Sequence, residues 1–232
     1  MEHEVFTWAS LIPGLADLPA HVSNGIMVSI ILLIVVFIGY TQLKKSEDQI
    51  IPDERVTVRS FLEVVVDGLS GLVESTMGPR GGEFLLIIGT LALFILFNNL
   101  SGLVPGFLPA TDNVNTTFAC SLTVFVMTHY YGVREHGIKY LKHFVGPFWW
   151  LAPIMIPIEI IGHLSRPLSL GLRLFGNITG DHLVTAIFFS LVPILVPLPV
   201  MLLGVFVAFV QTFVFMLLSM AYFSGAIAHE EH

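Results

Sequence analysis

The stretch from Glu159 to His182, EIIGHLSRPLSLGLRLFGNITGDH, decides how this chain must fold. It lies in the most apolar third of the protein, yet it holds nearly all the charge of that third. The only Asp, Glu, Lys and Arg side chains between His143 and His229 are Glu159, Arg166, Arg173 and Asp181, with His163 and His182 beside them. Ionisable groups are costly at membrane depth, so they usually line a transport path or meet a partner.

Most of these polar residues recur at helical spacing. At offsets of 0, 4, 7, 14 and 18 residues, the series is Glu159, His163, Arg166, Arg173 and Asn177. These offsets are close to multiples of 3.6, so the series forms one stripe along a helix. At about 1.5 Å per residue, Glu159 and Arg173 lie roughly 21 Å apart, and His182 lies roughly 14 Å further on.

No carboxylate in the stretch is well placed to neutralise Arg173. Glu159 is too far, and Asp181 is just over two turns away. A guanidinium cannot lose its proton, so the sequence predicts an acidic partner on another chain. The competing interpretation is an arginine that reaches a lipid headgroup. For Arg166, followed by Pro167, both interpretations stay open, whereas apolar neighbours disfavour the headgroup for Arg173.

The composition is that of an integral membrane protein. Hydrophobic residues make up 55% of the chain, charged residues 12%, and the mean hydropathy is +0.85. These values predict several spans. The net charge of −7 gives no support for nucleic-acid binding. The sequence has no GxxxxGK[ST] or HExxH motif, and its one cysteine, Cys120, has no internal partner for a disulfide. We therefore expect no bound cofactor or metal.

The predicted fold is an all-α integral membrane protein. It has about five membrane-embedded helices and one amphipathic interfacial helix, and its last two helices form a long, tilted antiparallel hairpin. The segments, within a single membrane domain, are an outer tail (1–25), a first span (26–43), a cytoplasmic amphipathic segment (46–80), a helical hairpin (84–133), a cytoplasmic loop (134–146), the tilted hairpin (147–228) and a C-terminal tail (229–232). For residues 46–80 a solvated loop is the alternative.

The distribution of basic residues predicts the orientation. The Lys and Arg residues outside the polar stretch are Lys44, Lys45, Arg55, Arg59, Arg80, Arg134, Lys139 and Lys142. All eight fall on one side of the predicted spans, which the positive-inside rule places in the cytoplasm. The N-terminus is then outside and the C-terminus cytoplasmic. An acidic N-terminus without a transit signal favours a bacterial inner membrane.

The run from Ser169 to Asn177, SLGLRLFGN, closely resembles the signature of subunit a of the F-type ATP synthases. The resemblance covers the chain from the first span to the helix around Gln211. It implies a stator subunit, not an enzyme on its own, that couples proton flow to rotation of a ring of c subunits and to ATP synthesis. Its implied partners are the c ring, the b subunits of the peripheral stalk and the lipid bilayer.

The resemblance also implies roles for single residues. Arg173 matches the arginine that faces the c-ring carboxylate. Asn177, His182 and Gln211 match positions by an outer half-channel, and Glu159 matches the cytoplasmic exit. The other candidates for the proton path are His163, Ser169, Asp181 and Tyr222. Relatives carry an ionisable pair at the positions of His182 and Gly204; because glycine cannot ionise, we expect Asp181 to supply the carboxylate.

Facing positions in the tilted hairpin follow from its turn. Prolines at 193, 197 and 199 put the turn near residue 192. Gln211 then faces Arg173, residues 201–204 face His182, and Glu159 approaches residues 222–225. The hairpin thus has polar zones toward both membrane faces with a fixed positive charge between them. This pattern suits two half-channels that do not connect.

Two other classes of protein fit part of the pattern. A secondary transporter could use Arg173 to bind an anionic substrate, but the chain shows no second copy of the arginine-bearing helix, as an inverted repeat would predict. A structural assembly subunit would leave the polar stripe unexplained. Substrate uptake by the isolated chain would favour the transporter. Full proton pumping with Arg173→Ala would favour the assembly subunit.

Overall fold

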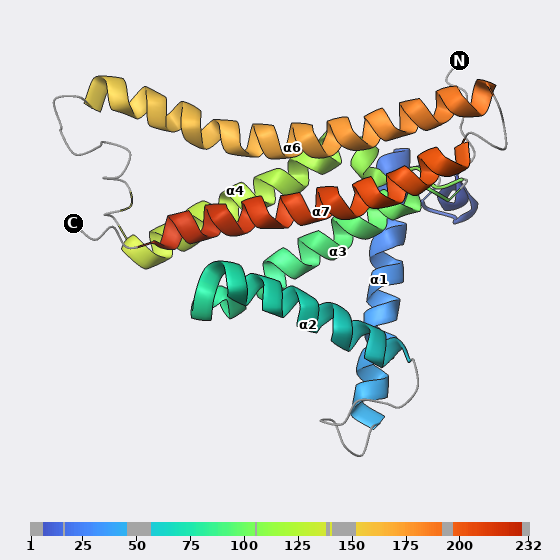
Figure 1. Ribbon diagram of the computed structural model, residues 1–232, viewed down its shortest axis with the longest axis horizontal. Coiled ribbons are helices and arrows are strands. Elements are labelled where there is room, and N and C mark those ends of the chain that lie inside the picture. The colour runs from blue at the N-terminus through green and yellow to red at the C-terminus, as the bar shows by residue number, and fades with distance from the viewer. Residues whose placement is uncertain are drawn as a thin grey trace. The chain divides into compact units, whose positions relative to one another are not determined.

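The computed structural model describes residues 7–15, 17–45, 57–104, 106–137, 140, 152–191 and 197–228 (Figure 1). Within these ranges the regular structure is entirely helical, which confirms the all-α prediction. The remaining parts of the predicted segments, including Arg55, Lys139, Lys142 and Pro193, lie outside the described residues. The chain divides into two compact units, Met1–Ala110 and Thr111–His232, and each is described by itself.

The N-terminal unit is built on three α-helices. They are α1 (Ala20–Lys45), α2 (Val58–Met77) and α3 (Leu85–Ser101), with short 3-10 helices η1 (Trp8–Leu11) and η2 (Gly78–Glu83). Helix α1 packs against both α2 and α3. It begins six residues before the predicted first span.

Helix α2 has the form predicted for an amphipathic segment, and a solvated loop is excluded for Val58–Met77. Thr57 caps it by accepting a hydrogen bond from the backbone N–H of Ser60. Arg59 is buried and its Nε donates to Glu63 Oε1 at 2.6 Å. Its backbone N–H donates to the Gln42 side chain of α1 at 3.0 Å. The two helices are therefore tied together by polar as well as apolar contacts.

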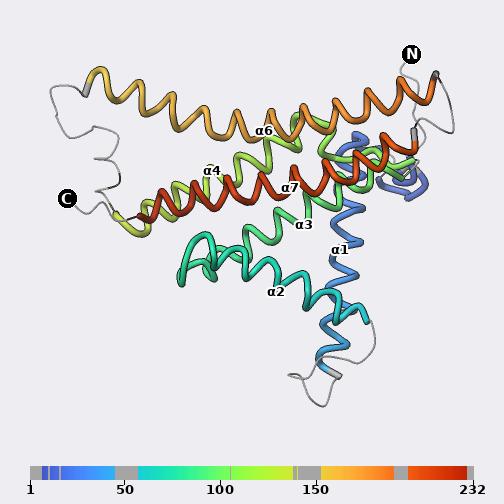
Figure 2. Tube along the Cα trace, in the orientation of Figure 1, coloured from blue at the N-terminus to red at the C-terminus, as the bar shows by residue number. Residues whose placement is uncertain are grey.

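The C-terminal unit consists of three long helices that pack on one another. They are α4 (Val114–His136), α6 (Ala152–Leu191) and α7 (Pro197–Ile227). Each of the three contacts the other two (Figure 2). Asn113 caps α4 by accepting from the backbone N–H of Asn115, and Gly137 ends it at a φ of 56°.

Helix α6 is longer than a perpendicular span requires. Its 40 residues extend about 60 Å, roughly twice the thickness of a bilayer's hydrocarbon core. Such a helix must tilt strongly to keep its apolar surface out of water. Pro157 and Pro167 lie inside it. The helix is continuous through both prolines, and Figures 1 and 2 show it as one bowed helix.

Helices α4 and α6 lie close together at a glycine. A Cβ at Gly171 would lie 2.9 Å from Ser121 Oγ and 3.4 Å from the Phe118 ring, so any larger residue requires these side chains of α4 to move. The apolar core of this unit comprises Cys120, Val124, Leu170, Leu174, Ile178, Ala208, Phe215, Met216, Met220 and Phe223. This core holds the polar side chains of α6 in fixed positions.

Two described helices are long and apolar enough to cross a membrane, Ala20–Lys44 and Leu198–Ile227. Many of their large apolar side chains are exposed, among them Leu33 and Phe37 of α1 and Leu202 and Phe206 of α7. A surface of this kind is typical of helices that contact lipid. The count of five membrane-embedded helices stays a prediction.

Candidate functional site

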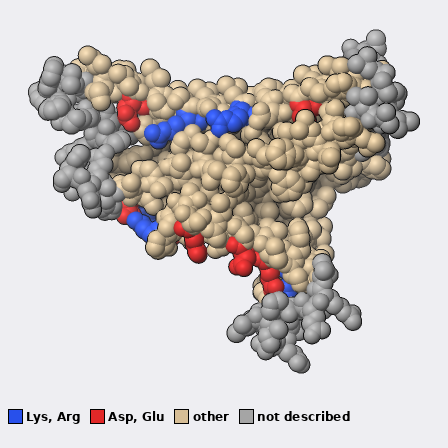
Figure 3. Space-filling view, in the orientation of Figure 1, with Lys and Arg blue, Asp and Glu red and all other residues tan. Residues whose placement is uncertain are grey.

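The charged residues of α6 are grouped by sign along the helix. Figure 3 shows basic side chains near its middle and acidic side chains on either side of them. Glu159 and His163 lie toward one end, and Asp181 and His182 toward the other. Arg173 lies between these two groups.

Arg173 is half-buried and makes one side-chain hydrogen bond. Its Nη2 donates to Ser169 Oγ, one turn earlier, at 3.3 Å. Within the described ranges no carboxylate forms an ion pair with it. Serine neutralises no charge, so the guanidinium keeps its full positive charge on this face of α6. The arrangement leaves Arg173 able to bind a carboxylate from another chain.

The amide pair lies one turn further along. Asn177 Nδ2 of α6 donates to Gln211 Oε1 of α7. Gln211 is buried, and its Nε2 finds no hydrogen-bond partner among the described residues. A buried amide donor of this kind usually binds water, so the pair can hold an ordered water between the two helices.

The predicted register of the hairpin was wrong by about one helical turn. The prediction set Gln211 opposite Arg173, and the structure pairs Gln211 with Asn177. The same offset places Tyr222 against Arg166, whose Cζ lies 5.6 Å from the ring centroid. Helix α6 ends at Leu191 and α7 begins at Pro197, so the midpoint of the hairpin lies two residues later than predicted.

Asp112, Thr179 and His182 form a cluster that we call the outer cluster, after its predicted side of the membrane. Asp112 belongs to the short helix η3 (Ala110–Asp112), directly before α4. Its Oδ2 lies 3.3 Å from His182 Nδ1, and its Oδ1 accepts a hydrogen bond from Thr179 Oγ1 at 2.6 Å. Both α6 residues lie within one turn, so a single carboxylate ties them to the start of α4.

The electrostatics of this cluster favour an ionised Asp112. Burial acts to raise the pKa of its carboxyl group, but the hydrogen bonds from His182 and Thr179 and the charge of His182 outweigh it. The pKa of Asp112 therefore lies below its ordinary value of 3.8. The ionised carboxylate and the imidazole together offer a proton an acceptor oxygen and an acceptor nitrogen.

Sequence reasoning missed Asp112. The prediction assigned the carboxylate beside His182 to Asp181, which is half-exposed and makes no hydrogen bond or ion pair with a described residue. A role for Asp181 stays a prediction. The available signal was the position of Asp112, the last acidic residue before the helix that packs against α6.

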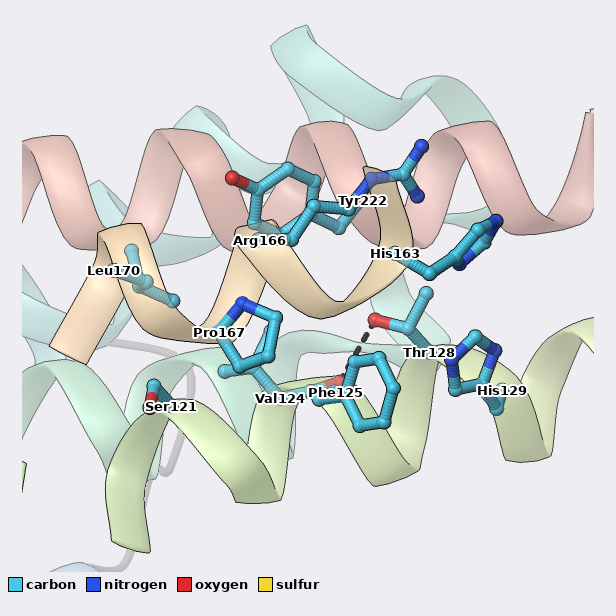
Figure 4. Close-up of a pocket in the computed structure, with 10 residues that line it drawn as sticks. All are labelled: Ser121, Val124, Phe125, Thr128, His129, His163, Arg166, Pro167, Leu170 and Tyr222. Atoms are coloured by element: carbon cyan, nitrogen blue, oxygen red, sulfur yellow. Dashed lines mark hydrogen bonds between the residues drawn. The ribbon is translucent and has the colours of Figure 1, made fainter. Parts of the chain in front are cut away.

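The inner cluster lies at the opposite end of the contact between α4 and α6. His163 Nε2 donates to Glu159 Oε1 at 3.1 Å, and the His163 side chain is buried. Figure 4 shows His163 facing His129 of α4 at one end of a small cavity. A larger cavity of about 170 Å³ is lined by Tyr140, His163, Arg166, Ala221, Tyr222, Gly225 and Ala226. It has room for several water molecules.

Comparison with known proteins identifies the family. The model of the ATP synthase A chain matches residues 25–224. The chain belongs to the ATP synthase subunit a family. ATP synthase subunit a of Trichlorobacter lovleyi is 60% identical over 170 residues, 73% of this chain and 74% of the relative. ATP synthase subunit a 2 of Syntrophotalea carbinolica is 53% identical over 196 residues, 84% of this chain and 82% of the relative. As a subunit a, the chain is a membrane component of an ATP synthase, with a part in proton transport and ATP synthesis.

Proposed function

We propose that this subunit a is the stator that lets protons reach and leave a rotating ring of c subunits through two separate half-channels. The observation that carries the proposal is the position of Arg173. It lies between an outer and an inner titratable cluster, and no described carboxylate neutralises it. The family resemblance supplies the missing acid, a carboxylate on each c subunit.

The outer half-channel is formed by Asp112, Thr179 and His182 and continues to Asn177 and Gln211. The short spacing from His182 to Asn177, five residues on one helix, is about 7.5 Å along the axis and can be bridged by water. Polar side chains thus extend from the cluster to Asn177, one helical turn from Arg173, and can conduct a proton over that length.

The inner half-channel is formed by Glu159 and His163, the adjoining cavity and Tyr222. Arg166 lies over the Tyr222 ring, a cation–π contact that keeps its charge at the cavity wall. This contact within the protein favours a place in the path for Arg166 over a reach to lipid headgroups. Between the cavity and Arg173, α6 presents Ser169, which the guanidinium contacts.

Arg173 couples proton transfer to rotation. A c-ring carboxylate is costly to ionise in lipid, so it crosses the lipid as the neutral acid. At about 4 Å from the guanidinium, the ionised form gains about 4 kcal/mol at an effective dielectric of 20. The carboxylate therefore releases its proton to one half-channel there and takes up another from the second. The same charge repels a proton that would pass directly between the half-channels.

The rest of the assembly follows from the resemblance and the charge distribution. The c ring faces Arg173, and the b subunits of the peripheral stalk and the bilayer are the other contacts. The chain has about five membrane-embedded helices with α2 at the cytoplasmic surface of a bacterial inner membrane. The N-terminus is outside and the C-terminus cytoplasmic. Exposed apolar residues of α2, including Phe61 and Val64, support its interfacial position.

The test is ATP-driven acidification of inverted membrane vesicles that contain the whole complex. We expect Arg173→Ala to abolish pumping while the complex remains assembled, because the c-ring carboxylate loses its counter-charge. Arg80→Ala is the matched control, since it removes a positive charge from η2, outside the α6 stripe. It should pump at the wild-type rate. Pumping at that rate by an assembled Arg173→Ala complex would refute the proposal and favour a structural role.

A further inference from the structure

A second histidine lies against the inner cluster, on a helix that the proposed path does not use. The rings of His129 (α4) and His163 (α6) have centroids 5.1 Å apart and are inclined by 32°. His129 Nδ1 and Tyr140 Oη are joined by a hydrogen bond of 2.7 Å. Together with the hydrogen bond between His163 and Glu159, these contacts form a continuous series of four titratable side chains.

The surroundings hold this series in place. Phe125 packs its edge against the His129 ring, with centroids 4.3 Å apart and planes at 88°. Gly132 lies against the Tyr140 ring, and a Cβ there would overlap it. Both His163 and Tyr140 are buried, and both line the cavity of about 170 Å³. The four side chains thus have fixed neighbours and contact a space large enough for water.

We propose that His129 and Tyr140 extend the inner half-channel from α6 to α4, and that protons pass between the two helices at the His129–His163 contact. The proposal rests on the proposed function. It assigns proton-relay roles to two residues beyond Glu159 and His163 and places the cytoplasmic mouth beside the end of α4.

The transfer is a relay that leaves each group with its original number of protons: His163 is reprotonated from Glu159, and His129, left as its other tautomer, is reset by rotation of its ring. Imidazole accepts a proton on one ring nitrogen and releases one from the other, so His129 can take a proton from His163 and pass one to Tyr140. Tyr140 accepts that proton on Oη while its own phenolic proton goes to water in the cavity. A ring rotation or one water molecule spans the gap between the imidazoles. The steps run in reverse when the complex pumps.

The alternative is a structural role, in which His129 only fixes Tyr140 at the end of α4. Two substitutions separate these roles. His129→Gln keeps a side-chain amide that can bond to Tyr140 but cannot shuttle a proton. His129→Leu removes both properties. Tyr140→Phe keeps the packed ring and removes only the hydroxyl group.

The experiment is ATP-driven acidification of inverted vesicles, with assembly of each complex checked first. We expect His129→Gln and His129→Leu to slow pumping by a similar factor, about fivefold or more, since positioned proton transfer contributes at least that much. Tyr140→Phe should slow it as well. Thr128→Ala is the matched control: Thr128 precedes His129, and its hydroxyl only donates to Val124 O at 2.7 Å. It should pump normally.

Two results would overturn the relay. One is normal pumping by His129→Gln with slow pumping by His129→Leu, which is the signature of a structural histidine. The other is normal pumping by assembled His129→Gln and Tyr140→Phe complexes. Arg173→Ala, assayed in parallel, distinguishes a failure of the relay from a failure of the half-channel proposal. If it abolishes pumping while His129→Gln pumps normally, only the relay fails; if Arg173→Ala pumps normally, the half-channel proposal itself fails.

Discussion

The outer cluster gives a prediction that can be worked from distances. Asp112→Asn removes the negative charge 3.3 Å from His182 Nδ1 but keeps an oxygen that can accept from Thr179. At that distance the attraction is about 1.3 kcal/mol at the dielectric of water and about 5 kcal/mol at an effective dielectric of 20. The side chains of His182 and Asp112 are 25% and 28% exposed, so solvent screens the pair considerably. We take about 1–2 kcal/mol as the loss.

That loss has a direct effect on proton uptake. Since 1.4 kcal/mol corresponds to a factor of ten, the protonated form of the cluster becomes about tenfold less populated at a given outer pH. Uptake from the outer side should slow in proportion. Because the slower uptake comes from a smaller protonated fraction of the cluster, lowering the outer pH by about one unit should restore the rate of proton uptake.

The assay is ATP synthesis by inverted vesicles, in which the lumen corresponds to the outer side and its pH can be set before the gradient is imposed. We expect the Asp112→Asn rate to fall about tenfold at a lumen pH of about 7 and to recover near pH 6. Asp17→Asn is the control, because Asp17 is an exposed carboxylate in the predicted outer tail. An assembled Asp112→Asn complex that works normally, or a deficit that persists at the lower pH, would refute the reasoning.

Two further predictions concern the stability of the C-terminal unit. Gly171→Leu places a side chain where a Cβ alone would lie 2.9 Å from Ser121 Oγ. We expect it to destabilise the subunit by about 1–3 kcal/mol, measured by thermal unfolding of the solubilised complex. Gly176→Leu is the control and should not destabilise the subunit, because a Cβ at Gly176 meets nothing within 4 Å. The pKa of Asp112 is lower in the folded chain than in the unfolded chain, so its stabilising contribution is present above the ordinary value of 3.8 and is lost as pH falls through the folded value. The unfolding temperature should therefore fall below about pH 4, and by less in Asp112→Asn; an equal fall in both would show that other groups cause it.

Side-chain contacts within α6 could be predicted from the sequence because both partners of each contact lie on the same helix. Spacing alone put Glu159, His163 and Arg173 on one stripe, and the structure shows Glu159 bonded to His163 and Arg173 bonded to the residue one turn before it. Contacts at i and i+4 follow from helical geometry without any knowledge of the fold. This is why the local pairs needed no tertiary information.

Contacts between helices could not be predicted to the same accuracy. The register of α6 against α7 depends on where the turn lies, and a shift of two residues in its centre moved the partner of Gln211 from Arg173 to Asn177. The partner of His182 was missed for a related reason. Asp112 is 70 residues away in sequence, and only the packing of α4 against α6 brings it close.

The packing of α4 on α6 also suggests how the two proposed half-channels would stay separate. The helices run antiparallel, with contacts from Asp112 to His182 at one end, Ser121 to Gly171 in the middle and His129 to His163 at the other. The two titratable contacts are separated by 17 residues from Asp112 to His129 and by 19 residues from His163 to His182. At the rise of an α-helix these separations are about 26–29 Å, close to the thickness of the hydrocarbon core.

Between these titratable contacts the two helices meet through mostly apolar side chains, and the small cavity of Figure 4 lies toward the end at His129 and His163. At the centre of the contact Gly171 lies against Ser121 and the Phe118 ring, and Leu170 and Val124 are both buried. The Ser121 hydroxyl group donates its proton to the Phe118 carbonyl of its own helix rather than to α6. A proton that enters at one end therefore meets packed side chains before it reaches the other. In the proposed function, the proton then advances only on the c-ring carboxylate that moves past Arg173, which is half-buried on α6.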